Sequence, residues 1–229
     1  ITFTADDLTI NQKALTVIAD AKSKTYGDTD PELTYTTDGL VGEDSLTGSL
    51  DRVAGEDVDT YAINQGTLDN ANYDITFNSD DLTIDAKALT VTADAVSKTY
   101  GSDDPEFTYS APELESGDSL TGALARSAGE NVGTYAINQG TLANSNYAIT
   151  FTSANLTINP TALTVTANAV SKTFGETDPA LTFTTIGLIS EADLTGSLTR
   201  VTGSDIGTYA IERGSLKATS NYTLSFIGN

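Results

Sequence analysis

The 229-residue sequence contains no cysteine, no histidine, no methionine and no tryptophan. Without cysteine there can be no disulfide, no thiolate nucleophile and no cysteine-ligated metal. Without histidine the chain lacks the side chain that most often serves as a general base or a metal ligand. These absences exclude most familiar catalytic sites, and only carboxylate pairs, Ser–Lys pairs or metal-bound water remain as routes to catalysis.

Basic residues are also scarce, since 11 of them stand against 32 acidic residues and give a formal net charge of −21. A surface of this sign repels nucleic acid and anionic lipid, so we expect no nucleic-acid partner. No apolar run is long enough to span a bilayer, and we expect no membrane insertion. No signal peptide opens the sequence, which we interpret as an internal segment of a larger secreted protein.

What the sequence does contain is an internal repeat. The motif Lys24–Gly27 returns at Lys98–Gly101 and at Lys172–Gly175, with a spacing of 74 residues each time. This period is too long for one turn of a solenoid, which takes about 20–50 residues, and it suits a small domain. We therefore predict four segments: the closing strand of a preceding repeat at 1–12, repeat 1 at 13–86, repeat 2 at 87–160, and repeat 3 at 161–229, which lacks its final strand.

The pattern inside each repeat predicts β-strands. Apolar and polar residues alternate in Leu89–Ala93 and again in Tyr147–Phe151, as they do in half-buried strands. The alternation slips between Phe151 and Leu156, which predicts a bulge or turn at residues 152–155. Short helical turns are expected near residues 43, 117 and 191, but no amphipathic helix. The predicted fold class is mostly β, a linear array of three small β-domains.

A second recurring motif points to the kind of β-domain. Asp57–Ile63, Asn131–Ile137 and Asp205–Ile211 share a spacing that resembles the tyrosine corner of immunoglobulin-like domains. In that corner the tyrosine hydroxyl donates a hydrogen bond to the backbone upstream. The motif favours an immunoglobulin-like sandwich for each repeat. A β-grasp-like arrangement is the alternative, because a 74-residue repeat is short for seven strands.

The apolar positions of repeat 1 predict its core. Phe174 replaces the tyrosine of the first motif in repeat 3, and we interpret this to mean that the ring packs while the hydroxyl is dispensable. The predicted core residues, with their counterparts in the other repeats, are Leu15, Val17, Tyr26, Leu33, Tyr35, Leu46, Leu50, Tyr61, Ile63, Tyr73, Ile75 and Phe77.

The motifs in their order resemble a known repeat family. Repeat 1 carries them as Lys24–Pro31, Asp44–Leu50 and Asn72–Ile84, and the chain as a whole resembles the bacterial MBG-type repeat of the Tyr-Gly variety. The resemblance implies arrays within large secreted or surface-anchored bacterial proteins, many of them adhesins that resemble filamentous haemagglutinins. One further departure is Thr161, which stands where the other repeats have lysine.

Acidic turns are the candidate metal sites. Carboxylate oxygens are ligands that Ca²⁺ prefers, but aspartate before proline is also ordinary turn chemistry. We therefore predict no catalytic, cofactor-binding or metal-binding residues, and structural Ca²⁺ is the alternative. The residues concerned are Asp28, Asp30, Asp103, Asp104, Glu176 and Asp178, with the pairs Asp6/Asp7 and Asp80/Asp81 at the junctions.

Recurring lysines raise the hypothesis of an isopeptide bond between lysine and asparagine. The alternative, which we favour, is that each lysine protects an edge strand from pairing with other chains. The lysines are Lys24, Lys98 and Lys172, and the recurring asparagines are Asn72, Asn146 and Asn221.

The sequence predicts a non-enzymatic stalk of a bacterial cell-surface adhesin, located outside the cell. Its partners would be the neighbouring repeats of the same chain, and a distal tip would bind a host or matrix glycan or protein. Short links between repeats favour a stiff, monomeric rod. The alternative is a module whose repeats bind a glycan or host protein through avidity, using the variable loops Thr36–Gly39, Ser110–Glu113 and Thr184–Gly187.

Two further hypotheses complete the sequence-based expectations. An unrecognised hydrolase would require a deep pocket lined by carboxylates. In concentrated solution, the spare strand at Ile1–Ile10 of one copy would complete the open edge of a neighbouring copy.

Overall fold

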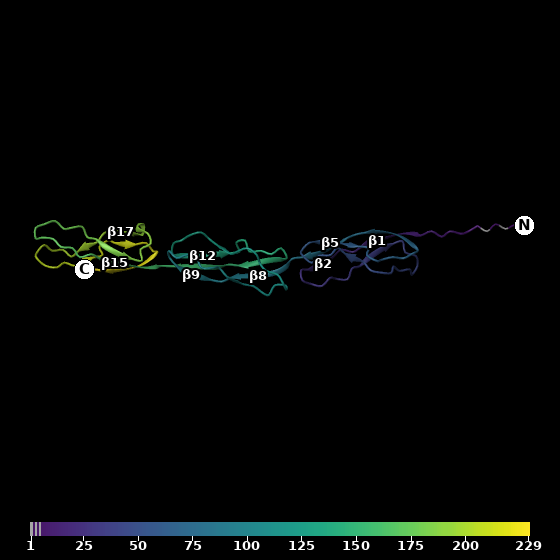
Figure 1. Ribbon diagram of the computed structural model, residues 1–229, viewed down its shortest axis with the longest axis horizontal. Helices are drawn as coiled ribbons and strands as arrows, with labels where there is room; N and C mark the ends of the chain where they lie inside the picture. Colours follow the sequence, from purple (N-terminus) through teal and green to yellow (C-terminus); the bar gives the residue numbers. More distant parts are fainter. Residues whose placement is uncertain (1, 3, 5) are drawn as a thin grey trace. The chain divides into compact units, whose positions relative to one another are not determined.

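The computed structural model describes residues 2, 4 and 6–229 (Figure 1). The closing strand predicted at residues 1–12 therefore lies partly outside the described residues, and its residues 6–12 carry no strand. The described chain forms two compact units. The first contains the chain up to Thr90 together with Pro112–Thr121 and Ala143–Thr150, and the second contains Val91–Ala111, Gly122–Leu142 and Phe151–Asn229.

Repeat 1 consists of two small sheets. One has the strand order β3-β1-β6, and the other has the order β2-β7-β5-β4. The pairs β1/β6 and β2/β7 are parallel, while the other pairs are antiparallel, so both sheets are mixed. The strands are β1 (Lys13–Ala19), β2 (Lys22–Thr25), β3 (Tyr35–Asp38), β4 (Asp51–Arg52), β5 (Thr60–Asn64), β6 (Tyr73–Asn78) and β7 (Asp81–Asp85).

Repeat 2 has the same organisation, with strand orders β10-β8-β13 and β11-β12-β14-β9. The predicted break in alternation is confirmed, because one strand ends at Thr152, the next begins at Ala154, and the chain changes sheet between them. The strands are β8 (Lys87–Ala93), β9 (Val96–Thr99), β10 (Tyr109–Ser110), β11 (Ala125–Arg126), β12 (Gly133–Asn138), β13 (Tyr147–Thr152) and β14 (Ala154–Asn159).

Repeat 3 keeps the first sheet, in the order β16-β15-β21, but only two-stranded pieces accompany it. Among the described residues, repeat 3 has no counterpart of β7 or β14 and no strand at 170–173, where β2 and β9 stand in the other repeats. The elements are β15 (Thr161–Ala167), β16 (Phe183–Ile186), η1 (Glu191–Asp193), β17 (Leu194–Thr195), β18 (Thr199–Arg200), β19 (Ile211–Glu212), β20 (Lys217–Ala218) and β21 (Tyr222–Ile227).

The mostly-β class is confirmed, and so is most of the predicted core. In repeat 1 two clusters of buried side chains hold Leu15, Val17, Ile63 and Tyr73 together with partly buried neighbours that include Leu50 and Phe77. The sequence-based core missed two side chains of β7, namely Leu82 at 0% and Ile84 at 1% exposure. The segment predicted as a closing strand is thus the most deeply buried strand of the second sheet.

Two predicted core residues have other positions. Tyr26 is not in the core of its own repeat, because its ring packs against Tyr147 of repeat 2. Tyr61 lies outside the buried clusters of repeat 1, and the Arg52 guanidinium stacks on its ring at 5.4 Å. The tyrosine-corner hydrogen bond itself is confirmed, since the Tyr61 hydroxyl donates to the Asp57 carbonyl at 2.9 Å.

The expected helical turns are present in one repeat only. Repeat 3 has the 3-10 turn η1, whereas the corresponding segments of repeats 1 and 2 are hydrogen-bonded turns. In the part of the chain that the structure describes, no helix has the length and apolar character needed to cross a membrane.

Candidate functional site at the repeat joints

The joint between repeats 1 and 2 is built around one carboxylate. The Tyr26 hydroxyl of repeat 1 donates to Asp118 Oδ2 of repeat 2 at 2.9 Å. The Tyr147 hydroxyl donates to the same oxygen at 2.7 Å, and the two rings meet edge to face with centroids 5.6 Å apart. The hydrogen bond to Asp118 raises the pKa of Tyr26, and burial raises the pKa of Tyr147. Both hydroxyls therefore stay protonated and able to donate.

The backbone around Tyr26 explains why a glycine follows it. The Tyr26 amide donates to the Asp85 carbonyl at 2.8 Å, which fixes the turn to the end of β7. Gly27 has φ of +85°, a conformation that favours glycine. A Cβ at this position would lie 2.6 Å from Glu115 Oε1 of repeat 2. The Tyr-Gly pair thus combines a donor with a backbone that permits close approach.

Asn146 forms the second half of this joint. Its Oδ1 accepts a hydrogen bond from the Val58 amide at 2.9 Å, and its Nδ2 donates to Asp57 Oδ1 at 2.8 Å. The asparagine is only 7% exposed. Because the tyrosine corner binds the carbonyl of Asp57, it shapes the same loop that Asn146 holds. The corner motif and the recurring asparagine therefore serve one structure.

The joint between repeats 2 and 3 repeats this geometry. The Tyr100 hydroxyl donates to Asp193 Oδ2 at 2.9 Å, and its ring lies edge to face on Tyr222 at 5.4 Å. Asn221 Oδ1 accepts from the Val132 amide, and Asn221 Nδ2 donates to Asn131 Oδ1, each at 2.9 Å. The two joints therefore share a tyrosine clamp and an asparagine clamp.

A pair of substitutions distinguishes the two joints. In the first, the Lys87 ammonium forms an ion pair with Glu115. In the second, Thr161 and Ile189 occupy the positions 74 residues further on, and Thr161 Oγ1 donates to the Tyr100 carbonyl at 2.6 Å. A Cβ on Gly101 would meet Ile189 Cδ1 at 2.3 Å. The threonine that departs from the lysine pattern thus belongs to a coordinated change from a charged to an uncharged joint.

The interpretation that the tyrosine hydroxyl is dispensable is wrong. At both described joints the hydroxyl donates to a carboxylate of the following repeat. Phe174, which suggested the opposite, is 69% exposed and packs in no joint within the described chain. A phenylalanine is tolerated there because no carboxylate faces it.

Sequence reasoning also missed the carboxylates that accept these hydrogen bonds. Asp44 and Asp118 are 74 residues apart, but the next position in register is Ala192, and Asp193 supplies the carboxylate instead. The 3-10 turn η1 contains Asp193. A strict register therefore hides this residue. The signal that could have found it is an acidic residue in the same short turn of every repeat.

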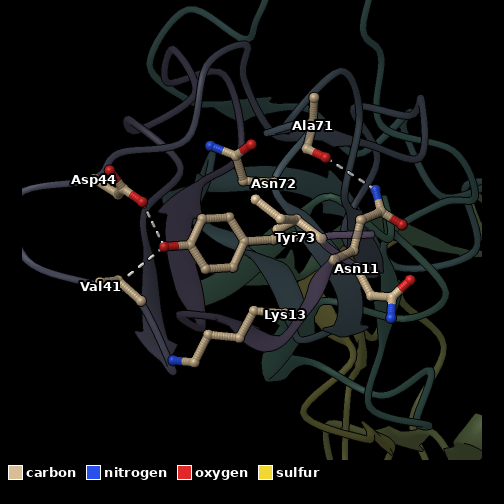
Figure 2. A pocket seen from close by; sticks show the side chains of 9 residues that line it. Asn11, Lys13, Val41, Asp44, Ala71, Asn72 and Tyr73 are labelled. Carbon is tan, nitrogen blue, oxygen red and sulfur yellow. Dashed lines mark hydrogen bonds between the residues drawn. The ribbon is translucent and has the colours of Figure 1, made fainter. Parts of the chain in front are cut away.

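Repeat 1 has the accepting half of a joint at its own N-terminal end. Figure 2 shows the Tyr73 hydroxyl between Asp44 and Val41: it donates to Asp44 Oδ2 at 2.6 Å and accepts from the Val41 amide at 2.9 Å. These residues line a pocket of about 310 Å³ together with Asn72 and Lys13. Asn72 is exposed here, whereas its counterparts at the two joints are buried.

The acidic turns are used for ion pairs. Asp30 lies between Arg52 Nε at 2.6 Å and Lys24 Nζ at 2.7 Å, and these two cations, Arg52 foremost, lower the pKa of Asp30 to about 2. Asp104 and Asp178 have the same environment in the other repeats. Within residues 6–229 no group of three or more acidic side chains is arranged to hold a metal ion.

The remaining acidic candidates are placed separately. The Asp28 carbonyl accepts from Lys24 Nζ at 3.1 Å, and Glu176 Oε2 accepts from the Thr173 amide at 2.9 Å. Asp103 neighbours Asp104 in sequence, but only Asp104 faces the cations Lys98 and Arg126. The structure thus brings together one aspartate of each predicted pair with a lysine and an arginine.

The recurring lysines and asparagines belong to different networks. Lys24 and Lys98 lie on the edge strands β2 and β9, as the favoured interpretation expected. Their side chains are only 4% and 5% exposed, and each ammonium pairs with two carboxylates. Asn146 and Asn221 make their side-chain hydrogen bonds at the joints instead. The lysines are therefore buried ion-pair partners, and the hypothesised isopeptide partners are engaged elsewhere.

Comparison with known proteins adds the family. The family model described as the MBG domain (YGX type) matches residues 15–83, 89–157 and 163–229. The chain belongs to the MBG domain family. Nothing among curated proteins and nothing among solved structures matched it. MBG domains form repeat regions of the kind found in surface proteins, and theirs is not a known enzyme family. The Tyr-Gly pair that characterises this type of MBG domain is the residue pair at the described joints.

Proposed function

We propose that this chain is a non-catalytic stalk segment of a bacterial cell-surface adhesin, which projects a distal binding domain away from the cell. The observation that carries the proposal is the doubly clamped joint. At each described joint a tyrosine of one repeat and an asparagine of the next donate hydrogen bonds across the boundary. A chain of unrelated domains on flexible linkers would have no need for such contacts.

The links between the repeats support the same function. Only Ala86 separates β7 from β8, and only Pro160 separates β14 from β15. A one-residue link between strands leaves little freedom, and proline restricts it further by fixing its own φ. Clamps and links together would resist bending of one repeat on the next. Resistance to bending is what a stalk requires in order to hold a binding domain at a distance.

The charge of the chain fits an exposed stalk. A net charge of −21 spread over 229 residues keeps neighbouring stalks apart through repulsion between like charges. At an ionic strength of 0.15 M this repulsion acts over a Debye length of about 8 Å, so it opposes close contact without straining each repeat. We place the chain outside the cell, where MBG repeats would extend from the surface.

The test is small-angle X-ray scattering of this chain with and without a calcium chelator. We expect a radius of gyration well above about 17 Å, the value for a compact chain of this length, and a maximum dimension on the order of 100 Å or more. The double variant Tyr26→Ala/Tyr100→Ala should bend and give a broader distribution of distances. Phe174→Ala is the matched control and should scatter as the parent chain does.

Several outcomes would count against the stalk. A radius of gyration near the compact value would contradict it directly. A profile that shortens when calcium is removed would make calcium a structural partner of the acidic turns. Robust binding of a single repeat on a glycan array would favour the alternative of a glycan-binding module.

A further inference from the structure

Repeat 3 has a groove where the other repeats have a strand. The groove has a volume of about 680 Å³ and is lined on one side by Val170–Phe174 and on the other by Tyr209 and Ile211, with Asn229 also in its lining. Val170 is 42% exposed and Phe174 is 69% exposed. The opening therefore runs along the inner edges of two segments that would otherwise flank a strand.

Repeats 1 and 2 show what fits this place. In repeat 2, β14 lies between β9 and β12, parallel to the first and antiparallel to the second. Leu156 of β14 is opposite Val96 and Tyr135, and it is 0% exposed. In repeat 3 the residues at the positions of Val96 and Tyr135 are Val170 and Tyr209, which both line the groove. The groove is thus the place of a central strand.

The same chain carries an unused segment of the required sequence. Asp7–Asn11 reads DLTIN, while β7 reads DLTID and the last five residues of β14 read NLTIN. Leu8 and Ile10 are each 88% exposed, and residues 6–12 form no strand. Their counterparts in β7 and β14 are the most buried side chains of those strands. The segment and the groove therefore each leave exposed what the other would cover.

We propose that Asp7–Asn11 of a second copy of this chain inserts into the groove of repeat 3 as its missing central strand. The register follows from repeat 2. Leu8 would lie opposite Val170 and Tyr209, and Ile10 would lie opposite Lys172. Insertion pairs the backbone of 170–173 on one side and that of 208–210 on the other, and it buries both apolar side chains in one step.

The surfaces next to the groove also match. Insertion brings the exposed Asn72 of one copy to the loop at Asp205 and Ile206 of the other, which is the pairing that Asn221 makes with Asn131 and Val132. Ile206 is 93% exposed in the free chain. The contact between copies is thus a third joint of the kind already described, with the Tyr73 head shown in Figure 2 as its accepting half.

Two features of this third joint make it weaker than the internal ones. Phe174 cannot donate the hydrogen bond that Tyr26 and Tyr100 give to a carboxylate. Both copies also carry a charge of −21, so they repel one another. Because the contact joins different surfaces of the two copies, each added copy offers a new groove and a new segment. Self-association should therefore depend on concentration and increase with salt, since screening shortens the Debye length from about 10 Å at 0.1 M to about 3 Å at 1 M.

The experiment is sedimentation analysis of the full chain from micromolar to millimolar concentration at low and high salt. We expect association that grows with both. Leu8→Asp/Ile10→Asp should remove the segment and leave a monomer, and Val170→Asp should remove the groove and also leave a monomer. Ile186→Asp is the matched control, since it places the same charge on a side chain that is 76% exposed and outside both surfaces, and it should associate as the parent does.

Mixing the two monomeric variants gives the decisive result. Leu8→Asp/Ile10→Asp keeps its groove and Val170→Asp keeps its segment, so the mixture should form a one-to-one complex and nothing larger. Hydrogen exchange at β15 and β21 checks that Val170→Asp still folds, and if it does not, the segment variant alone decides. The proposal is overturned if the segment variant associates like the parent, if the parent does not associate at all, or if protection of residues 7–11 is independent of concentration.

Discussion

The C-terminal ends of repeats 2 and 3 contain nearly the same residues but differ in how these residues are covered. Lys98 is 5% exposed in its side chain, whereas Lys172 is 31% exposed; Arg126 is 11% exposed, whereas Arg200 is 26% exposed. In repeat 2 the central strand β14 is in place and Tyr100 packs on the following repeat. The comparison teaches that a central strand and a following repeat, more than local sequence, determine the environment of this end.

One detail of the network shows the same dependence. Glu130 pairs with both Lys98 and Arg126, but the corresponding residue of repeat 3 is Ser204, so that Lys172 and Arg200 share Asp178 alone. A covered pair of cations thus has two carboxylates, and a more exposed pair has one. Desolvated charges need more partners than solvated ones, which agrees with this difference.

The largest effect is expected from shortening the central strand's buried side chain. Leu156→Ala should destabilise repeat 2 by about 2–5 kcal/mol, because it leaves a cavity where the side chain is 0% exposed. Hydrogen exchange should report the loss at β9 and β12. Leu8→Ala is the matched control in dilute solution and should change stability by less than about 0.5 kcal/mol, since that leucine is exposed. Equal effects of the two changes would contradict the comparison.

A smaller effect is expected at the glycine of the joint. Gly101→Ala and Gly175→Ala both place a Cβ at positive φ, of +82° and +90°, which costs about 1–2 kcal/mol. Only at Gly101 does the Cβ also meet Ile189 of the next repeat, since Gly175 has nothing within 4 Å. Gly101→Ala should therefore shift the NMR signals of the Ile189 methyl groups and weaken the joint as well. Unshifted methyl signals would mean that the joint has room to spare.

The ion pair at the open end should change with pH in a defined direction. Arg200 and then Lys172 lower the pKa of Asp178 to about 2, against an ordinary value of 3.8. The stabilising contribution is therefore fully present above pH 3.8 and is lost as the pH falls toward 2. Arg200→Gln should raise the pKa of Asp178 toward 3.8 in a carboxyl NMR titration. Arg126→Gln, the matched change in repeat 2, should leave the pKa of Asp178 where it was.

The smallest effect is expected from removing one hydroxyl. Tyr100→Phe deletes the hydrogen bond to Asp193 and keeps the ring against Tyr222. Hydrogen exchange around η1 should increase, but by less than in Gly101→Ala, because Asp193 still accepts a hydrogen bond from Tyr222 at 3.1 Å. The reverse change, Phe174→Tyr, should have no effect in dilute solution. If the two changes had equal effects, the hydroxyl would have no role in the joint.

The sequence alone predicted the strands, the tyrosine corner and the change of sheet near Ser153 because these depend on local patterns. It placed Tyr26 in the wrong core, because alternation shows that a side chain is apolar but not which repeat covers it. It also undervalued Leu82, since a strand at the end of a repeat looks peripheral in sequence although it lies between two others in space. The clamps depend on pairing across a repeat boundary, which no single repeat reveals.

The parallel strand pairs have a mechanical consequence. In repeat 1 the first strand, β1, runs parallel to β6, with Lys13 opposite Tyr73, and β2 runs parallel to β7, the last strand. A pull on the two ends of the repeat would slide these strands along one another, so that their hydrogen bonds would share the load instead of opening one after another. Forced unfolding is governed by the height of the unfolding barrier. A surface fibre built in this way would transmit shear from a flowing medium to the cell with its repeats still folded.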